Sequence, residues 1–385
     1  MRTDHPVVVL GLFETGLAVA RSLGRNGVHV VAVGHRPCWA SASKYVSEFL
    51  ICPHPLTEEA AFCEFLSRRF GGHVFKPVLM VTADEFLIAV SRNRASLADS
   101  FLIGIPEERL LESIVDKYAQ ARLAEGCGVA TPATHCPAAQ DDVDELAARL
   151  HFPVVVKGRY VAQWRRSLGA VAKAFVVDDA RDLARVLSRI WSLGIEPIVQ
   201  EVISGPDANH YKVCVYVSPD GKLRLCFGLR KIRQSPPRLG AGSAVRSLAW
   251  PQLLATGLSL FQGLKYTGVG SAEFKLEERD GRLKLIELNP RYWQQNWLAA
   301  QCGMDFPVTE YRELTGQQVA CPSTFEEGVV WVSPAADLRS AVAYMRSGEL
   351  SISGWLGSLR GKRVLADFSW DDPRPFVRRI LSKAA

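Results

Sequence analysis

Two glutamates and an asparagine in the second half of the chain have types and spacing that could do chemistry. Glu273 lies in one predicted strand, Glu287 and Asn289 lie in the next, and Asp280-Gly281 between them predicts a tight hairpin. Side chains two positions apart on a strand share one face. A solvated strand face would carry the same residues, but apolar neighbours flank Glu287, and a buried carboxylate needs a cation or hydrogen-bond donors. Two carboxylates and an amide oxygen suit Mg²⁺, which also takes phosphate oxygens.

Three lysines lie where they could meet an anion. Lys157 ends a run of apolar residues that predicts a buried strand, and Lys117 follows Asp116 at the start of a predicted helix. Lys231, together with Arg233, lies just before Gly240–Ser243, which predicts a flexible glycine-rich loop. Basic groups beside such a loop suit phosphate. Taken singly, each of these lysines also fits an ordinary surface position.

The elements that must position these residues follow two patterns along the chain. Residues 1–115 alternate short apolar runs with helical segments, which predicts an open, Rossmann-like α/β domain with a parallel sheet. From about residue 117 to 320 the pattern changes to antiparallel hairpins, typical of an α+β arrangement. The remaining residues, 321–385, are rich in Trp and Arg and include a predicted helix.

The turn Gly11–Gly16 follows the first predicted strand and opens a helix, which raises the possibility of a dinucleotide site. The three-glycine fingerprint is absent, because Phe13 stands where the second glycine belongs. An NAD(P)-dependent dehydrogenase is therefore a weak alternative. The sequence also contains no Walker A motif, so an ATP site would have to be built differently from a P-loop.

The overall composition is that of an ordinary globular protein. The chain has 385 residues, a formal net charge of +6 and 48% hydrophobic residues. No basic run is interleaved with aromatic residues, so we expect no nucleic-acid partner. No apolar stretch reaches about 18 residues, so we expect no membrane span. The nine cysteines have no C-x-x-C spacing, which favours free thiols in a reduced cytoplasm.

Read in order, these features resemble the ATP-grasp superfamily and, within it, predicted carboxylate–amine ligases. The matching stretches run from Asp116-Lys117 through Phe152–Lys157 and Val199–Gly205 to the acidic hairpin ending at Arg291. The resemblance implies a Rossmann-like pre-ATP-grasp domain at 1–115 and ATP-grasp subdomains A (116–195) and B (196–320). A short C-terminal extension (321–385) follows them.

The resemblance also implies roles for the matching residues. The ATP-binding set would be Lys117, Lys157, Ser167, Gly169, Gln200, Glu201, Ile203, Asp207 and Lys231. Within it, residues 200–203 would form the adenine hinge, Asp207 would bind the ribose hydroxyls, and Lys231 would touch the γ-phosphate. Arg291 would steady an acyl phosphate, so Lys231 and Arg291 are the candidate catalytic residues. Glu273, Glu287 and Asn289 would hold Mg²⁺, with Mn²⁺ as a substitute.

Three positions depart from the pattern of the superfamily. The phosphate-covering loop, expected at 160–169, carries Trp164, Arg165 and Arg166 instead of small residues. Gln200 stands where Glu is common, although its carbonyl can still accept from the adenine amino group. Asp207 is one methylene shorter than the usual Glu.

The activity that the resemblance implies is ATP-dependent ligation of a carboxylate to an amine, with ADP and phosphate released. The expected partners are small-molecule carboxylate and amine substrates, and the resemblance also implies a homodimer. One alternative is an ATP-grasp ligase with a non-amine nucleophile. Another is a non-catalytic nucleotide-binding scaffold.

Overall fold

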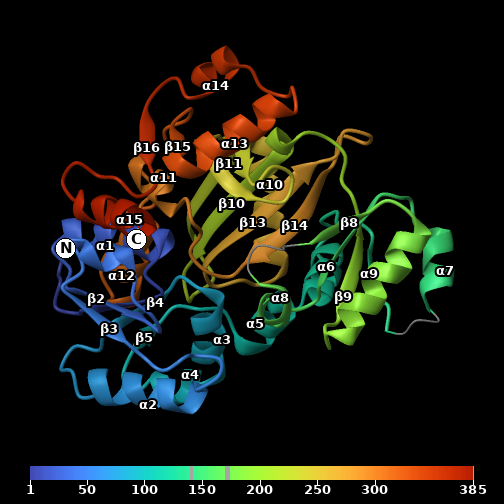
Figure 1. Cartoon of the computed structure of the whole chain (residues 1–385). Helices are drawn as coiled ribbons and strands as arrows, with labels where there is room; N and C mark the ends of the chain where they lie inside the picture. The colour runs from blue at the N-terminus through green and yellow to red at the C-terminus, as the bar shows by residue number, and fades with distance from the viewer. Residues whose placement is uncertain (139–141, 170–173, 385) are drawn as a thin grey trace.

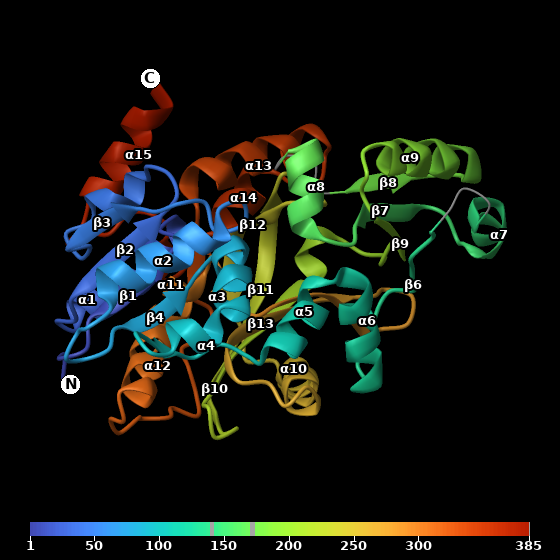
Figure 2. The ribbon, with the colours of Figure 1, turned by 90° about the horizontal axis from the view of Figure 1, so that it is seen from below.

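Three β-sheets organise the chain. The structure, a computed structural model, describes residues 1–138, 142–169 and 174–384. It contains sheets of five, four and seven strands. Figures 1 and 2 show the four-stranded sheet, in green, set apart from the blue N-terminal sheet, and the red C-terminal helix α15 lying beside that blue sheet.

The N-terminal sheet is parallel and has the strand order β3-β2-β1-β4-β5. Its strands are β1 (Val7–Leu10), β2 (Val30–Gly34), β3 (Glu48–Ile51), β4 (Val78–Val81) and β5 (Leu102–Ile103). The helices of this region are α1 (Glu14–Arg25), η1 (Trp39–Ala42), α2 (Glu59–Phe70), α3 (Asp84–Arg92), α4 (Arg94–Leu97) and α5 (Glu108–Val115). The predicted open α/β arrangement is confirmed.

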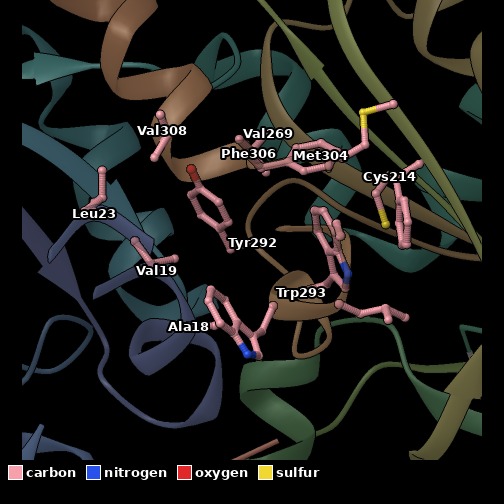
Figure 3. Packing of buried hydrophobic residues seen from close by; sticks show 14 of the residues in the cluster. Ala18, Val19, Leu23, Cys214, Val269, Tyr292, Trp293, Met304, Phe306 and Val308 are labelled. Carbon is pink, nitrogen blue, oxygen red and sulfur yellow. The ribbon is translucent and has the colours of Figure 1, made fainter. Parts of the chain in front are cut away.

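Both faces of this sheet are buried, which explains the apolar runs in the sequence. Val7 and Val9 pack into one hydrophobic cluster, and Val8 and Leu10 into another, as the two-residue period of a strand requires. The first cluster continues from α1 into residues of the seven-stranded region. Figure 3 shows Val19 and Leu23 of α1 facing Tyr292. The N-terminal sheet therefore shares a core with the rest of the protein.

The four-stranded sheet is antiparallel, with the order β6-β9-β7-β8. Its strands are β6 (Thr134–His135), β7 (Val154–Gly158), β8 (Phe175–Val177) and β9 (Pro197–Glu201). The helices before and within this region are α6 (Lys117–Gly126), α7 (Asp142–Arg149), α8 (Val161–Leu168) and α9 (Ala180–Ser192). α9 buries Leu183, Leu187 and Ile190, which are spaced for one helical face.

The seven-stranded sheet has the order β14-β13-β10-β11-β12-β15-β16. Its strands are β10 (His210–Val217), β11 (Leu223–Ser235), β12 (Ala241–Ser247), β13 (Gly268–Leu276), β14 (Leu283–Asn289), β15 (Val330–Val332) and β16 (Arg363–Leu365). The associated helices are η2 (Asp207–Asn209), α10 (Pro251–Gly263), α11 (Asn296–Gln301), α12 (Phe306–Leu314), α13 (Pro334–Arg346), α14 (Ile352–Ser358) and α15 (Arg374–Ala384). Both predicted hairpins, β10–β11 and β13–β14, are confirmed.

The C-terminal segment is built into the body of the protein. β15 pairs with β12, and β16 pairs with β15, so residues after 320 extend the seven-stranded sheet. α15 packs against η1 of the N-terminal region, and Arg21 of α1 forms a buried ion pair with Asp372 at 2.9 Å. The segment thus joins the central sheet to the N-terminal sheet. No helix among the described residues is long and apolar enough to cross a membrane.

Candidate functional site

A cavity of about 740 Å³ is lined by residues of the four-stranded and seven-stranded sheets. The four-stranded sheet contributes β7, β8 and β9, and the seven-stranded sheet contributes β10, β11, β13 and β14. The loop from Arg238 to Gly240 and the start of β12 also line it. Most of the residues predicted from the sequence to bind ATP or metal line this one cavity.

The two glutamates lie directly opposite each other on the hairpin. Glu273 of β13 pairs with Glu287 of β14, and Ser271 pairs with Asn289. Glu287 and Asn289 are two residues apart and therefore share the face that Glu273 occupies. All three predicted magnesium ligands line the cavity. The prediction that they lie together on neighbouring strands is confirmed.

Lysines hold both carboxylates in the charged form. Burial acts to raise the pKa of Glu273, but Lys212 and Lys231 outweigh it, and the pKa lies well below its usual range. The Nζ atoms of Lys212 and Lys231 lie 2.9 and 2.8 Å from the carboxylate oxygens of Glu273. Burial likewise opposes ionisation of Glu287, but Lys117, whose Nζ is 2.5 Å from its carboxylate, lowers the pKa of Glu287.

Lys212 is a member of the site that sequence reasoning missed. It lies on β10 among apolar neighbours, is 5% exposed and lines the cavity. A lysine inside an apolar strand is the same signal that identified Lys157, so the sequence did contain a clue. Lys157 is the last residue but one of β7 and lies in the cavity wall, where burial, and then the charge of Lys117, lowers its pKa to about 8.

The hinge residues lie at the end of β9. Gln200 is buried, and its amide nitrogen donates to the Thr134 hydroxyl at 2.7 Å, which leaves its carbonyl oxygen available as an acceptor. The Glu201 carboxylate forms ion pairs with Arg279 at 2.7 Å and Lys284 at 3.1 Å. The carbonyl oxygen of Ile203 accepts from Lys275 at 2.7 Å. All three predicted hinge residues line the cavity.

Arg291 connects the cavity to the N-terminal sheet. Its guanidinium makes two contacts with the carboxylate of Asp84, at 2.5 and 3.0 Å, and Asp84 begins α3. Burial opposes the charge of Arg291, but Asp84 outweighs it and raises the pKa. The planar fork of an arginine suits a carboxylate or a phosphate. Asp84 occupies the Nε–Nη2 edge of this fork, so an anion in the cavity would meet the Nη1 edge, which also donates to the carbonyl oxygen of Tyr292 at 2.9 Å.

The segment expected to be a phosphate-covering loop is largely helical. Residues Val161–Leu168 form α8, and Gly169 ends it with a φ of 78°. The helix forms because Trp164 is buried against β7, so closely that a Cβ on Gly158 would lie 2.9 Å from the Trp164 Cβ. Trp164 and Arg165 line the cavity, whereas Ser167 and Gly169 are not among its lining residues.

The prediction of a flexible loop at Gly240–Ser243 is also wrong. Residues from Ala241 onward form β12, which pairs with β11 and with β15. The segment forms a strand because the strands on both sides satisfy its backbone hydrogen-bonding groups. Arg233, which the sequence suggested as an anion-binding group, instead forms a buried ion pair with Asp337 at 2.8 Å.

The donor set of the cavity fits a magnesium ion accompanied by phosphates. Among the described residues no group of three His, Cys, Asp or Glu side chains could hold a metal alone. Mg²⁺ needs only one or two carboxylates when phosphate oxygens and water complete its shell. The like charge of Glu273 opposes ionisation of Glu287 across the hairpin, although Lys117 keeps the pKa of Glu287 below its usual value. A bound cation would relieve that repulsion.

Solved structures with the same architecture identify the fold. N5-carboxyaminoimidazole synthetase from Staphylococcus aureus, in complex with ADP, is 14% identical with a TM-score of 0.66 over 85% of this chain and 81% of that chain. The L-amino acid ligase from Bacillus licheniformis is also 14% identical, with a TM-score of 0.62 over 82% of this chain and 75% of that chain. The chain has the ATP-grasp fold, as its sequence predicted.

One curated protein is similar to this chain in sequence. The chain is 24% identical over 254 residues to the D-aspartate ligase of Enterococcus faecium, strain Aus0004. The match covers 63% of this chain and 60% of that ligase, so the chain spans about three fifths of the length of this relative. No family model matches the chain. The resemblance is therefore to ATP-grasp proteins of the carboxylate–amine ligase type.

Proposed function

We propose that the protein is an ATP-dependent ligase that joins a carboxylate to an amine. The observation that carries this proposal is the pairing of Glu273 and Glu287 in a cavity that is also lined by five lysines. A nucleotide with several phosphate charges needs such a surplus of cations, and a divalent ion needs such acids. The fold and the D-aspartate ligase relative support the same reading.

In the proposed reaction the carboxylate oxygen of the acid attacks the γ-phosphorus of ATP, and ADP leaves. The product is an acyl phosphate, whose carbonyl carbon is then attacked by the amine nitrogen. The C–O bond to phosphate breaks, the nitrogen loses its proton, and an amide and inorganic phosphate result. Catalysis by the protein is then mainly positioning and charge neutralisation.

The proposed roles follow the position of each residue in the cavity. Glu273, Glu287 and Asn289 would hold Mg²⁺, or Mn²⁺ in its place, which supplies charge neutralisation on the phosphates. Lys117 and Lys157 would bind phosphate oxygens, and Lys231 the transferred γ-phosphoryl group. Arg291, held by Asp84, would bind the acyl phosphate and stabilise the oxyanion during attack.

The adenosine of ATP would lie at the β9 end of the cavity. Gln200, Glu201 and Ile203 would form the adenine hinge, and Asp207 would bind the ribose. Ser167 and Gly169 would reach the phosphates only if α8 moved towards them, since neither lines the cavity in this structure. Lys212 joins the proposal as a second lysine beside Glu273.

The direct test is ADP release from Mg-ATP against a panel of acids and amines, with mass spectrometry of each product. D-Aspartate is the first acid to include, because the curated relative is a D-aspartate ligase. We expect release only in wells that contain a matched pair, with a product mass equal to acid plus amine minus water. ATP turnover with no acceptor dependence, or Mg-ATP that fails to stabilise the protein in a thermal shift, would contradict the proposal. Turnover with a thiol, hydroxyl or bicarbonate would support the non-amine alternative.

The pH dependence of nucleotide binding gives a second test. Lys157 attracts phosphate only while its ammonium group is protonated, and its pKa in the free protein is lowered to about 8. Mg-ATP binding should therefore weaken as pH rises from about 7.5 to about 9.5, approaching tenfold per pH unit above the pKa. Isothermal titration calorimetry across this range would measure it.

The Lys157→Arg variant is the matched control for that titration. Arginine stays charged throughout the range, so the variant should bind Mg-ATP with a flatter pH profile. A wild-type affinity that does not change over the range would mean that Lys157 does not bind a phosphate.

Domain limits, location and assembly complete the proposal. We assign residues 1–115, 116–195 and 196–320 to the pre-domain and the two ATP-grasp subdomains, with 321–385 as the C-terminal extension. All nine cysteines are free thiols, which supports a reducing, cytoplasmic location. A homodimer is the expected assembly, which light scattering would test.

A further inference from the structure

α13, in the C-terminal extension, is held tightly against the sheet that carries the cavity. Its buried residues include Asp337, Ser340, Ala341 and Tyr344, a spacing that places all four on one helical face. Asp337 accepts two hydrogen bonds from the guanidinium of Arg233 on β11, at 2.8 and 2.9 Å. This ion pair fixes the position of the helix, and Tyr344 lies two turns further along the same face.

Tyr344 reaches the carboxylate that the resemblance assigns to the ribose. Its hydroxyl donates a hydrogen bond to Oδ2 of Asp207, and the backbone N–H of Arg238 donates to the same oxygen at 2.6 Å. Within the described residues, Oδ1 of Asp207 accepts no hydrogen bond. Asp207 lines the cavity, so one oxygen is held by the protein while the other remains available to a ligand.

The hydroxyl of Tyr344 stays protonated and can therefore donate its hydrogen bond at neutral pH. Tyr344 is 7% exposed. Burial, and then the hydrogen bond to Asp207, raises the pKa of its phenol, so the hydroxyl keeps its proton throughout the neutral range. A hydrogen bond to a charged acceptor is stronger than one between neutral groups. The contact therefore fixes both the side-chain rotation of Asp207 and the direction in which Oδ1 points.

We propose that Tyr344 is a positioning residue for nucleotide recognition, which orients Asp207 so that its free oxygen accepts a hydrogen bond from a ribose hydroxyl. The C-terminal extension thereby completes a nucleotide site whose other residues all precede residue 292. The inference rests on the proposed function, because it requires ATP as the ligand. It adds that selectivity for the ribose is set partly from outside the ATP-grasp subdomains.

The test compares three nucleotides on three proteins. Mg-ATP, Mg-2′-deoxy-ATP and Mg-3′-deoxy-ATP are titrated by calorimetry into the wild type, Tyr344→Phe and Tyr311→Phe. Tyr311→Phe is the matched control, because the Tyr311 hydroxyl donates to the carbonyl oxygen of His5 at 2.9 Å and Tyr311 does not line the cavity. Both substitutions remove one buried tyrosine hydroxyl and little else.

We expect the wild type to bind ATP more tightly than at least one deoxy analogue. Tyr344→Phe should weaken ATP binding about tenfold, as for the loss of one hydrogen bond to a charged group, and weaken that analogue much less. The preference for ATP over the analogue should therefore shrink in Tyr344→Phe and persist in Tyr311→Phe. In the ligase assay, KM for ATP should rise in Tyr344→Phe while kcat stays near the wild-type value.

Three outcomes would overturn the inference, and they are distinguishable. Equal weakening of all three nucleotides in Tyr344→Phe would show a general structural role. If the wild type bound ATP and both deoxy analogues equally, neither ribose hydroxyl would contribute to binding. That result would overturn the inference and leave the proposed ligase function intact. A wild type that binds no Mg-ATP would overturn the inference and the proposed function together.

Discussion

Replacing Glu287 by alanine should lower magnesium-dependent turnover by about a thousandfold, the rate equivalent of the several kcal/mol that a bound divalent ion contributes to phosphoryl transfer. The fold should survive. Glu287 projects from β14 into the cavity, and the pairing of β14 with β13 uses backbone groups that alanine retains. Removal of Glu287 also ends its repulsion with Glu273, which offsets part of the lost ion pair with Lys117.

The decisive measurement is ADP release over a magnesium titration, paired with thermal unfolding of the same samples. Glu287→Gln separates charge from size and should lose nearly as much activity as the alanine variant. Glu278→Ala is the matched control, because Glu278 is exposed at the turn end of the same hairpin. Turnover of Glu287→Ala within about tenfold of wild type would remove Glu287 from the set of metal ligands.

The parts of the fold that the sequence predicted are those decided by local pattern. The run Val7–Leu10 predicts a buried strand, and the turn at Asp280-Gly281 predicts the β13–β14 hairpin. The register of that hairpin could not be inferred, because Glu273 faces Glu287 only through a β-bulge between Glu273 and Phe274. The fold class is confirmed, since the order of these local elements is characteristic of an ATP-grasp protein.

The parts that the sequence did not predict depend on contacts between distant residues. Arg233 has the local appearance of an anion-binding residue, but its partner Asp337 lies 104 positions away in the sequence. The tail was expected as an extension, and nothing in its residues indicates that β15 would join β12. α8 replaces the expected loop because Trp164 packs on β7, a contact that spacing along the chain does not reveal.

The residues of the site likewise divide into those that local motifs predict and those that depend on contacts between distant residues. Lys117, Lys157 and Lys231 could be assigned from motifs, whereas the grouping of Lys212 and Lys231 around Glu273 required the strand order β13-β10-β11. Strand order is a long-range property, and no single hairpin determines it. The roles of these residues in binding ATP stay predictions until variants are measured.

The buried pair of Arg233 and Asp337 leads to the largest expected effect on stability. The two side chains are 4% and 2% exposed, and their contacts measure 2.8 and 2.9 Å. Asp337→Ala would leave the guanidinium charge buried without a counter-charge, with the Ser358 hydroxyl, at 2.6 Å, still accepting one of its hydrogen bonds. It should lower the free energy of unfolding by about 3–5 kcal/mol, measured in urea with the wild type alongside.

Two comparisons make the stability prediction specific to burial. Glu64→Ala breaks the exposed ion pair between Glu64 and Arg68, whose side chains are 65% and 79% exposed, and should cost only about 0.5 kcal/mol or less. The double variant Arg233→Met with Asp337→Leu removes both charges and should recover part of the loss, because neither charge then remains unpaired. If Asp337→Ala cost no more than Glu64→Ala, the Arg233 charge would have to reach water without its partner. In that case the ion pair would not be what holds α13, with Tyr344, against the cavity.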